Sequence, residues 1–408
     1  MQPTVVLLGT LDTKSTEYAF VREILQKTGI GTVTVDAGVL GEPGFRPDID
    51  RNRVADAGGG DLEKLVTGGD RGAALAVMQR GAAAIVRELH QEGRIQGALA
   101  LGGTGGTSLA AAAFRQLPLG FPKLIVSTAA SGNTEPYVSE TDLILAPSVV
   151  DISGLNRIST RVLANAAAAL IGMVSAPPLP EQGDRPMVAA SMFGVTTACV
   201  TQARERLEAL GYEVIVFHMT GSGGRAMESL ISQGFFAGVL DVTTTELADH
   251  LVGGVFDAGP DRLTAAATTG TPQVISVGAL DMVNFGPRDS VPPQFTDRNL
   301  YEHNASVTLM RTTPDECAGL GAELARKAST ASGPVTVVLP LRGISAIAGA
   351  GGPFFDPHAD DALFTAVRSG LEGSDAALVE LDTDINDPTF AEAIVDRLHA
   401  AITNQPAS

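Results

Sequence analysis

The segment TVVLLGTLDTKSTEYAFVREILQKTGIGTVTVD, residues 4–36, determines the fold class of this 408-residue chain. Residues 5–8 have the unbroken apolar character of a buried strand, and residues 16–28 have the periodicity of an amphipathic helix that ends at Gly29. Residues 32–35 then form a second apolar strand. A strand, a helix and a second strand in this order make a βαβ unit, in which the two strands are parallel.

The same alternation continues along the chain, interrupted by a Gly-, Pro- and Asp-rich insertion at residues 41–60. In the first half it predicts strands at 97–101, 123–127 and 142–146 and helices at 71–92, 108–116 and 154–174. In the second half it predicts strands at 187–192, 213–217, 236–240, 273–277, 335–339 and 377–381 and helices at 198–209, 358–370 and 388–402. We therefore expect an α/β fold with mainly parallel sheets that helices cover on both faces.

Four prolines within residues 177–186 are incompatible with a helix or an interior strand and mark a linker. We predict two doubly wound, Rossmann-like domains, at 1–176 and 187–408, joined by this proline-rich hinge. The second half also repeats a spacing of the first, because Gly29 precedes Asp36 by as many residues as Gly211 precedes His218. Either the second domain duplicates the first, or two ordinary βα units merely look alike.

Composition excludes several classes of protein. Apolar residues make up 44% of the chain and charged residues 18%, against roughly 25% charged in an average domain, which indicates a large interior. Residues 1–180 carry 15 Lys and Arg against 17 Asp and Glu, a net −2, and residues 181–408 carry 13 against 29, a net −16. Such an acidic second half disfavours nucleic acid and anionic membranes as partners.

The sequence also gives an expectation for the cellular location of the protein. No basic run precedes the first strand, and the longest small and apolar stretch, 166–174, is too short to span a membrane. Cys199 and Cys317 make no disulfide framework. We expect a cytoplasmic protein.

The loop after the first strand is the first of three candidate nucleotide-binding loops. Gly9 allows a ligand to approach the backbone closely, and Thr10 and Thr13 supply hydroxyls. Asp12 supplies a carboxylate for Mg²⁺ or a ribose, and Lys14 supplies a cation for phosphate. It is not a P-loop, because no glycine directly precedes the lysine. The alternative is a loop whose hydroxyls only cap the following helix.

Two further loops and one aspartate complete this candidate site. A glycine-rich loop between an apolar strand and an alanine-rich helix can form an anion-binding nest, or it is a tight turn required only by packing. Its residues are Gly102, Gly103, Thr104, Gly105, Gly106 and Thr107, and the third loop contributes Ser127, Thr128, Ser131 and Gly132. Asp36 ends the second strand, where an acid often binds a ribose hydroxyl, or it caps a turn. We expect the three loops to line one crevice.

Polar side chains near predicted strand ends of the second domain suggest a catalytic site. The candidates for catalysis are His218, Asp281, His303 and Arg311, and those for binding a substrate are Arg225, Asn304 and Arg342. In a shared pocket Arg311 and Arg342 would hold an anion while a set of His and Asp side chains acts as acid and base. A lone histidine is more often structural. No metal-binding spacing of His or Cys is present in the sequence, so the sequence does not decide whether the protein binds a metal.

Several strings of the sequence resemble a known family. The strings at 8–14 (LGTLDTK), 102–108 (GGTGGTS), 127–132 (STAASG), 218–228 (HMTGSGGRAME) and 278–286 (GALDMVNFG) are similar to those of the tomato-mosaic-virus-resistance-protein-like ATP-binding domain family, and the similarity covers essentially the whole chain. The resemblance implies two Rossmann-like subdomains, ATP binding through the three loops of the first domain, and a dimer. The chain departs from the family pattern at Ser15, where a glycine is common, and at Asp384, where a histidine is common.

Residues and resemblance together predict an ATP-binding protein, with or without Mg²⁺, that acts as a small-molecule enzyme through a cleft between its domains. Phosphoryl transfer, or ATP-assisted turnover of a carboxylate metabolite, fits the anion-binding loops and arginines. Two alternatives stay open: a regulatory module that binds the nucleotide without catalysis, and a sugar-acid or carboxylate enzyme with incidental ATP affinity. We expect a small-molecule ligand and a homodimer or higher homo-oligomer.

Overall fold

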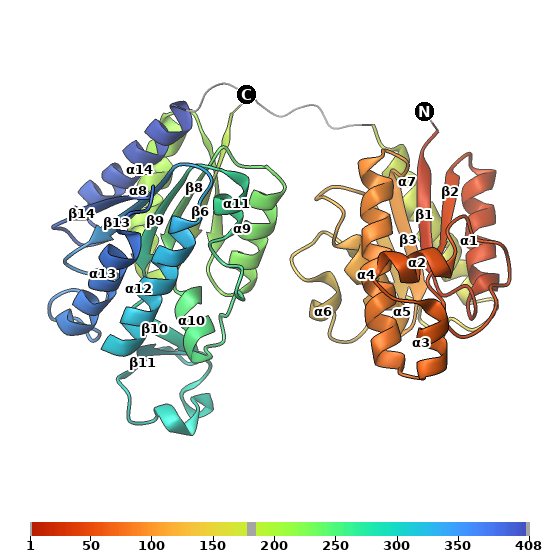
Figure 1. Ribbon diagram of the computed structural model, residues 1–408, viewed down its shortest axis with the longest axis horizontal. Coiled ribbons are helices and arrows are strands. Elements are labelled where there is room, and N and C mark those ends of the chain that lie inside the picture. Colours follow the sequence, from red (N-terminus) through yellow and green to blue (C-terminus); the bar gives the residue numbers. More distant parts are fainter. Residues whose placement is uncertain (1, 178–184, 405–408) are drawn as a thin grey trace. The chain divides into compact units, whose positions relative to one another are not determined.

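The computed structural model describes residues 2–177 and 185–404, so that all but residues 177, 185 and 186 of the predicted linker lie outside the described residues. The chain divides into two compact units, Met1–Pro180 and Glu181–Ser408 (Figure 1). Both units are α/β folds, as the sequence predicts, and each is described by itself.

The first unit is built on a five-stranded parallel sheet. In spatial order its strands are β2 (Gly31–Asp36), β1 (Thr4–Gly9), β3 (Gly97–Gly102), β4 (Lys123–Ser127) and β5 (Ile144–Pro147). The chain moves from β1 to β2 in one direction and then crosses back to β3 in the other. The strand order therefore reverses between β1 and β3, which is where open parallel sheets bind their ligands.

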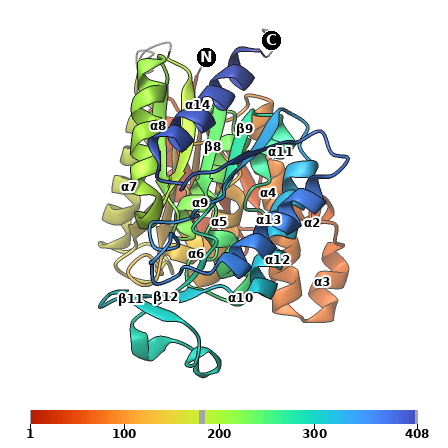
Figure 2. The same cartoon turned by 90° about the vertical axis from the view of Figure 1, so that its left-hand side faces the viewer.

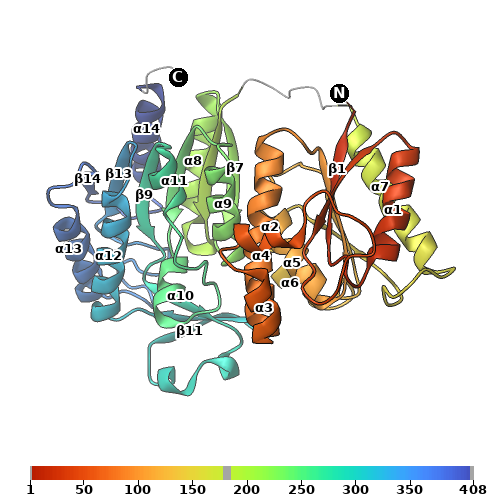
Figure 3. The ribbon, with the colours of Figure 1, turned by 45° about the vertical axis from the view of Figure 1, so that its right-hand side comes forward.

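Helices cover both faces of this sheet, because its strands are apolar on both sides. They are α1 (Ser15–Lys27), α2 (Arg51–Ala57), α3 (Leu62–Gly68), α4 (Arg71–Gln91), α5 (Thr104–Phe114), α6 (Glu135–Val138) and α7 (Ser159–Ser175). Val5 and Leu7 of β1 pack with residues of α1 and α7, whereas Val6 and Leu8 pack with residues of α2, α4 and α5. Figure 3 shows α1 and α7 on one side of β1 and α4 on the other.

Some helices of the first unit differ from those predicted. The helix predicted at 108–116 is α5, which begins at Thr104, so most of the glycine-rich loop is the first turn of a helix. The sequence pattern favoured a loop there because glycine has a low helix propensity. The insertion at 41–60 contains the short helix α2, which Asp50 caps by accepting a hydrogen bond from the amide of Arg53.

The second unit is built on a six-stranded parallel sheet. In spatial order its strands are β14 (Ala377–Leu381), β13 (Val335–Pro340), β9 (Gln273–Gly278), β8 (Gly238–Thr243), β6 (Met187–Met192) and β7 (Glu213–His218). The strands β6 to β9 are arranged like β1 to β4, since β6 and β1 each lie between the next two strands of the chain. This shared order agrees with the repeated spacing in the sequence.

Helices also cover both faces of the second sheet. α8 (Thr197–Ala209) and α14 (Pro388–Thr403) pack on one face. The other face carries α9 (Ser222–Ser232), α10 (Glu246–Val252), α11 (Ala265–Thr269), α12 (Pro314–Ser329) and α13 (Pro357–Leu371). Short 3₁₀ turns lie at η1 (Gly194–Thr196), η2 (Arg288–Ser290) and η3 (Pro293–Phe295).

A small antiparallel sheet, which the sequence pattern did not predict, belongs to the second unit. Its spatial order is β10 (Met282–Phe285), β12 (Val307–Arg311) and β11 (Leu300–Asn304). Figures 1 and 2 both show it outside the six-stranded sheet, close to α10. β11 escapes prediction because most of its residues are exposed and polar, so it lacks the apolar run of an interior strand.

Candidate functional site

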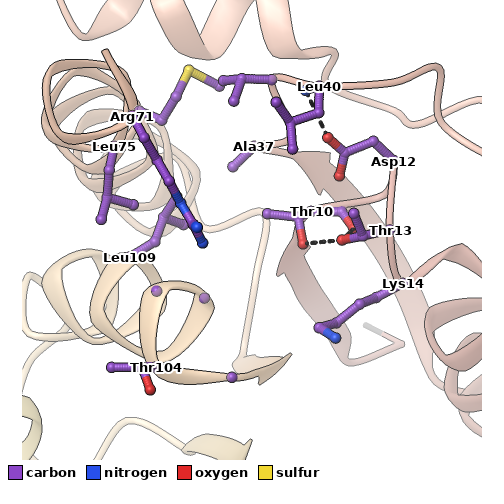
Figure 4. Close-up of a pocket in the computed structure, with 15 residues that line it drawn as sticks. Thr10, Asp12, Thr13, Lys14, Ala37, Leu40, Arg71, Leu75, Thr104 and Leu109 are labelled. Carbon is purple, nitrogen blue, oxygen red and sulfur yellow. Dashed lines mark hydrogen bonds between the residues drawn. The ribbon is translucent and has the colours of Figure 1, made fainter. Parts of the chain in front are cut away.

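A pocket of about 480 Å³ lies at the carboxyl ends of β1 and β3, where the strand order reverses (Figure 4). Its polar lining includes Thr10, Asp12, Thr13 and Lys14 from the loop after β1. The segment after β2, helix α4 and the first turn of α5 complete the wall. The first and second candidate loops of the sequence therefore meet in one pocket.

The first turn of α5 presents backbone N–H groups to this pocket. Its N-cap residue, Gly103, is extended and has no side chain with which to cap the helix. The first N–H groups of a helix have no partner inside the helix, and no hydrogen bond from the amides of Thr104, Gly105 or Gly106 is found among residues 2–177 and 185–404. These amides and the positive end of the helix dipole are the features by which helix starts attract anions.

The glycines of this turn are explained neither by backbone conformation nor by packing. Gly103, Gly105 and Gly106 have no positive φ angle. A Cβ at Gly105 would meet no atom within 4 Å, whereas a Cβ at Gly102 would lie 2.9 Å from the backbone of Gly106. Gly102 is thus required by packing, and Gly105 leaves space that the protein does not use. A bare backbone next to empty space allows a ligand to approach the amides closely.

Arg71 adds a cation that the sequence interpretation missed. It is the first residue of α4, and its side chain points into the pocket toward the first turn of α5 (Figure 4). No ion pair of Arg71 is found within the described part of the chain. Because it lies at a helix start and not at a strand end, no local signal in the sequence connects Arg71 with the two loops. Asp70, the cap of α4, positions it by accepting hydrogen bonds from the amides of Gly72 and Ala73.

The rest of the wall is apolar. It consists of Ala37, Val39, Leu40, Leu75, Met78 and Leu109. Leu40 is 82% exposed although it is a large apolar side chain. Pockets of this kind, mostly apolar with a few polar groups that converge on one region, are typical of small-molecule sites.

Two carboxylates hold the loop after β1 in place. Asp36 is buried and accepts hydrogen bonds from the amides of Leu11 at 3.0 Å and Gly38 at 2.9 Å, and burial raises the pKa of its carboxyl. Asp12 accepts a hydrogen bond from the amide of Leu40 at 2.8 Å and so ties the segment after β2 to this loop. Asp36 therefore lies behind the pocket wall as a positioning group, which favours the turn-capping interpretation.

Several predicted nucleotide-binding residues have structural roles instead. The ammonium group of Lys14 donates a hydrogen bond to the carbonyl of Ile152 at 2.6 Å, although the side chain lines the pocket. A Cβ at Gly9 would overlap the ring of Tyr18, so this glycine makes room for an aromatic side chain. The buried Thr107 hydroxyl bonds the Ser127 hydroxyl at 2.6 Å and joins α5 to β4.

The third loop does not reach this pocket, contrary to the expectation of a single crevice. Ser127, Thr128 and Ser131 line a separate hollow of about 270 Å³ at the ends of β4 and β5, together with Ser148 and Asp151. Gly132, which follows in the same loop, contributes its amide to a turn by bonding the carbonyl of Ala129. The strand spacing of the sheet separates the two sites, because β4 is one strand further from the reversal point than β3.

The predicted shared pocket of the second domain is also wrong for its charged members. Asp281 and Arg311 are buried in the interior, where burial raises the pKa of Asp281 to about 6 against the opposing charge of Arg311 and a hydrogen bond from Ser345. Arg311 binds the carboxylate of Asp360 at 2.6 Å. Both arginines proposed to hold an anion are therefore occupied, because Arg342 pairs on the surface with Asp382 at 2.6 Å.

The remaining candidates of the second unit lie nearer the surface. His218, His303 and Asn304 line a hollow of about 170 Å³ at the ends of β6 and β7. Arg225 donates a hydrogen bond to the carbonyl of Asp257 at 3.0 Å.

In the described part of the second unit, Arg262 fills the interior between β8, α9 and α10. Arg262 is 1% exposed and binds Asp241 of β8 at 2.6 Å, Glu246 of α10 at 2.8 Å and Glu228 of α9 at 3.1 Å. Burial raises the pKa of Glu246, and the charge of Arg262 opposes this shift. Ser191 of the neighbouring strand β6 donates a hydrogen bond to Asp241 at 2.7 Å.

Neither a metal centre nor a membrane helix adds to these sites. Over residues 2–177 and 185–404 no three His, Cys, Asp or Glu side chains are grouped so that they could hold a metal ion. In the same residues no helix is long and apolar enough to cross a membrane.

The strand order defines a two-unit, Rossmann-like α/β protein, and its first unit contains a pocket of about 480 Å³. The chain belongs to the uncharacterised protein family UPF0261, whose N-terminal domain model matches residues 3–178 and whose C-terminal domain model matches residues 185–402.

Comparison with known proteins gives the same family. A UPF0261 protein of Clostridium tetani is 50% identical over 98% of this chain and 98% of its own length. The ToMV resistance protein Tm-1(GCR237) of tomato, Solanum lycopersicum, is 43% identical over 97% of this chain and 55% of its own length, which confirms the resemblance seen in the sequence. A UDP-GlcNAc 2-epimerase structure from Methanocaldococcus jannaschii, at 10% identity, covers 99% of this chain and 93% of its own with a TM-score of 0.24, a similarity too weak to support any argument.

Proposed function

We propose that the first unit binds a nucleotide polyphosphate, with ATP as the first candidate, in the pocket at the ends of β1 and β3. One observation carries this proposal: the unpaired amides of the first turn of α5 face the same space as the guanidinium of Arg71. Backbone N–H groups at a helix start bind phosphate oxygens, and so does an arginine guanidinium.

The other walls of the pocket suit the remaining parts of a nucleotide. The apolar side chains Leu40, Leu75 and Met78 offer a surface for a base. The hydroxyls of Thr10 and Thr13, which bond each other at 2.9 Å, and the carboxylate of Asp12 supply polar partners for a ribose or for Mg²⁺. A volume of about 480 Å³ is within the usual range of roughly 300–1,000 Å³ for small-molecule sites.

Calorimetric titration of the full chain with ATP, ADP and adenosine tests the proposal. We expect ATP to bind more tightly than adenosine, and Arg71→Gln to weaken ATP by about tenfold or more, because hydrogen bonds to charged groups contribute about 1.5–3 kcal/mol. Arg94→Gln is a matched control, since Arg94 pairs with Glu92 on the surface, away from the pocket. Equal affinity for ATP and adenosine, or an unchanged Arg71→Gln variant, contradicts phosphate recognition.

A second experiment separates an enzyme from a regulatory module. The chain is incubated with ATP, Mg²⁺ and a panel of sugar acids and other carboxylate metabolites, and release of ADP and phosphate is measured. Turnover that His303→Gln abolishes while ATP affinity is kept supports an ATP-dependent enzyme acting on a carboxylate. ATP binding without turnover supports the regulatory alternative, and turnover independent of ATP supports a carboxylate enzyme with incidental affinity.

Two further properties belong to the same proposal. The family resemblance implies a homodimer, which light scattering on the purified chain tests directly. A cytoplasmic location is the expectation for a protein that uses ATP, and fractionation of the source cells tests it.

A further inference from the structure

The small hollow of the second unit, which the proposed nucleotide site does not use, has the composition of a ligand site of its own. Phe193 and Val195 follow β6, His218 ends β7, and His303 and Asn304 end β11, and all five line a volume of about 170 Å³. We call this the histidine hollow. It brings together residues that lie more than a hundred positions apart in the chain, at the carboxyl ends of two neighbouring parallel strands.

The inner part of the histidine hollow is apolar and built from aromatic rings. Phe193 is 8% exposed and contacts Phe256 edge to face, with the ring centroids 6.0 Å apart. The imidazole of His218 stacks on Phe193 at 5.5 Å, with 27° between the ring planes. Stacking on Phe193 orients this imidazole, which is exposed and lines the hollow.

The rim of the hollow offers hydrogen-bond donors. No hydrogen bond of the imidazole of His218 or of His303 is found within residues 2–177 and 185–404. The side-chain oxygen of Asn304 accepts a hydrogen bond from the amide of Ser306 at 2.8 Å, so its NH₂ group is directed elsewhere. Imidazoles and a side-chain amide are donors for a group that only accepts, and a carboxylate is such a group.

Charge and size narrow the class of ligand. No lysine or arginine lines the hollow, and the second unit carries an excess of acidic residues, so a dianionic phosphate lacks a counter-charge there. A volume of about 170 Å³ corresponds to roughly six molecules of liquid water, which is too small for a nucleotide. A short hydrocarbon body, in contrast, fits the apolar rings.

We infer that the histidine hollow binds a small monocarboxylate, whose carboxylate accepts hydrogen bonds from His218, His303 and Asn304 and whose apolar body lies against Phe193 and Phe256. The lining of this site belongs to the second unit, whereas the lining of the nucleotide pocket belongs to the first. It needs no metal and does not depend on the nucleotide proposal being correct.

Nuclear magnetic resonance of the full chain, labelled only at histidine, tests this inference. The chain has six histidines, so each imidazole signal can be assigned with single variants. The probe is isobutyrate, and isobutyramide is the neutral compound of the same shape. We expect isobutyrate to shift the signals of His218 and His303 with a dissociation constant on the order of 1 mM, and isobutyramide to leave them unchanged.

Variants then separate binding from general effects of salt. His218→Gln and His303→Gln should each weaken isobutyrate by about tenfold, whereas His358→Gln, which changes an exposed histidine at the start of α13, should not. Both hollow histidines are exposed enough for these variants to keep their fold. Equal shifts with the amide, equal shifts at His358, or no shift at His218 and His303 would overturn the inference.

Discussion

The two units have the same strand order around their first four strands, yet the point of reversal contains different chemistry in each. In the first unit it is an open pocket with free amides and Arg71. In the second unit it is filled by Arg262 and three carboxylates. Ala100 and Asp241 stand at the same position of their six-residue strands, β3 and β8. Strand order thus determines where a site can form, and a few side chains decide whether a ligand or the protein itself occupies it.

The largest effect that would test this comparison comes from removing the arginine of the second unit. Arg262→Met leaves Asp241, Glu246 and Glu228 without their buried counter-charge, and we expect a loss of about 3–5 kcal/mol in the free energy of unfolding. Arg71→Met in the first unit should cost less than about 0.5 kcal/mol, because Arg71 has no ion pair among the described residues to lose. Urea unfolding followed by circular dichroism measures both variants. Similar losses in the two would show that the open and filled sites do not differ.

The pH dependence of stability is the next largest effect. Burial raises the pKa of Asp249 to about 7 and that of Asp281 and Asp360 to about 6, in each case against hydrogen bonds or an arginine that favour the charged form. Between the ordinary value of 3.8 and these values the folded chain binds more protons than the unfolded chain, so stability falls as pH rises.

The pH dependence can be measured for the whole chain by its melting temperature and for each unit by hydrogen exchange. We expect the melting temperature to fall by about 3 °C or more between pH 5 and pH 8, because each pKa unit corresponds to about 1.36 kcal/mol. Hydrogen exchange followed by mass spectrometry at both pH values should place most of the loss in peptides of the second unit, since Asp36 is the one carboxyl of the first unit with a raised pKa among the described residues. A rise in stability over this range would contradict the assignment.

Two glycine substitutions test whether the first turn of α5 forms part of the open site of the first unit. Gly105→Ala adds a Cβ where no protein atom lies within 4 Å, so stability should stay the same or rise by up to about 1 kcal/mol, since alanine favours helices. ATP affinity should fall by about tenfold, because the added methyl occupies the space in front of the amides. Gly102→Ala is the matched control: its Cβ would meet backbone at 2.9 Å, so it should lower the melting temperature. An unchanged ATP affinity in Gly105→Ala would show that the amides of the first turn of α5 do not bind ATP.

The smallest effect concerns the segment after β2. Asp12→Ala removes the hydrogen bond to the amide of Leu40, and we expect faster hydrogen exchange at residues 39–44 with little change in global stability, about 1 kcal/mol at most. Asp56→Ala, at an exposed position of α2, is the control and should leave exchange in this segment unchanged. Unaltered exchange in Asp12→Ala would mean that this carboxylate does not hold the pocket wall.

Much of the candidate site was predictable because its signals are local. Thr10, Thr13, Gly103 and Gly105 follow apolar runs that can only be strands, and the ends of parallel strands meet at one edge. Arg71 was not predictable, because nothing in the residues around it shows that α4 begins beside the ends of β1 and β3. The antiparallel sheet that contains His303 was not predicted either, because its exposed strand β11 lacks an apolar pattern.

The sequence by itself determined the α/β class, the two-unit division, the approximate positions of the parallel strands and the family, because runs of apolar residues and glycine-rich turns act over short distances along the chain. Only the tertiary structure decided which polar groups bond to other groups of the protein and which face a cavity. Arg311 and Lys14 look like ligand-binding cations in a linear sequence, but each is already bound to oxygens of its own unit. A charged group removed from water must find a partner, and that partner is chosen by distance in space, which one-dimensional spacing does not record.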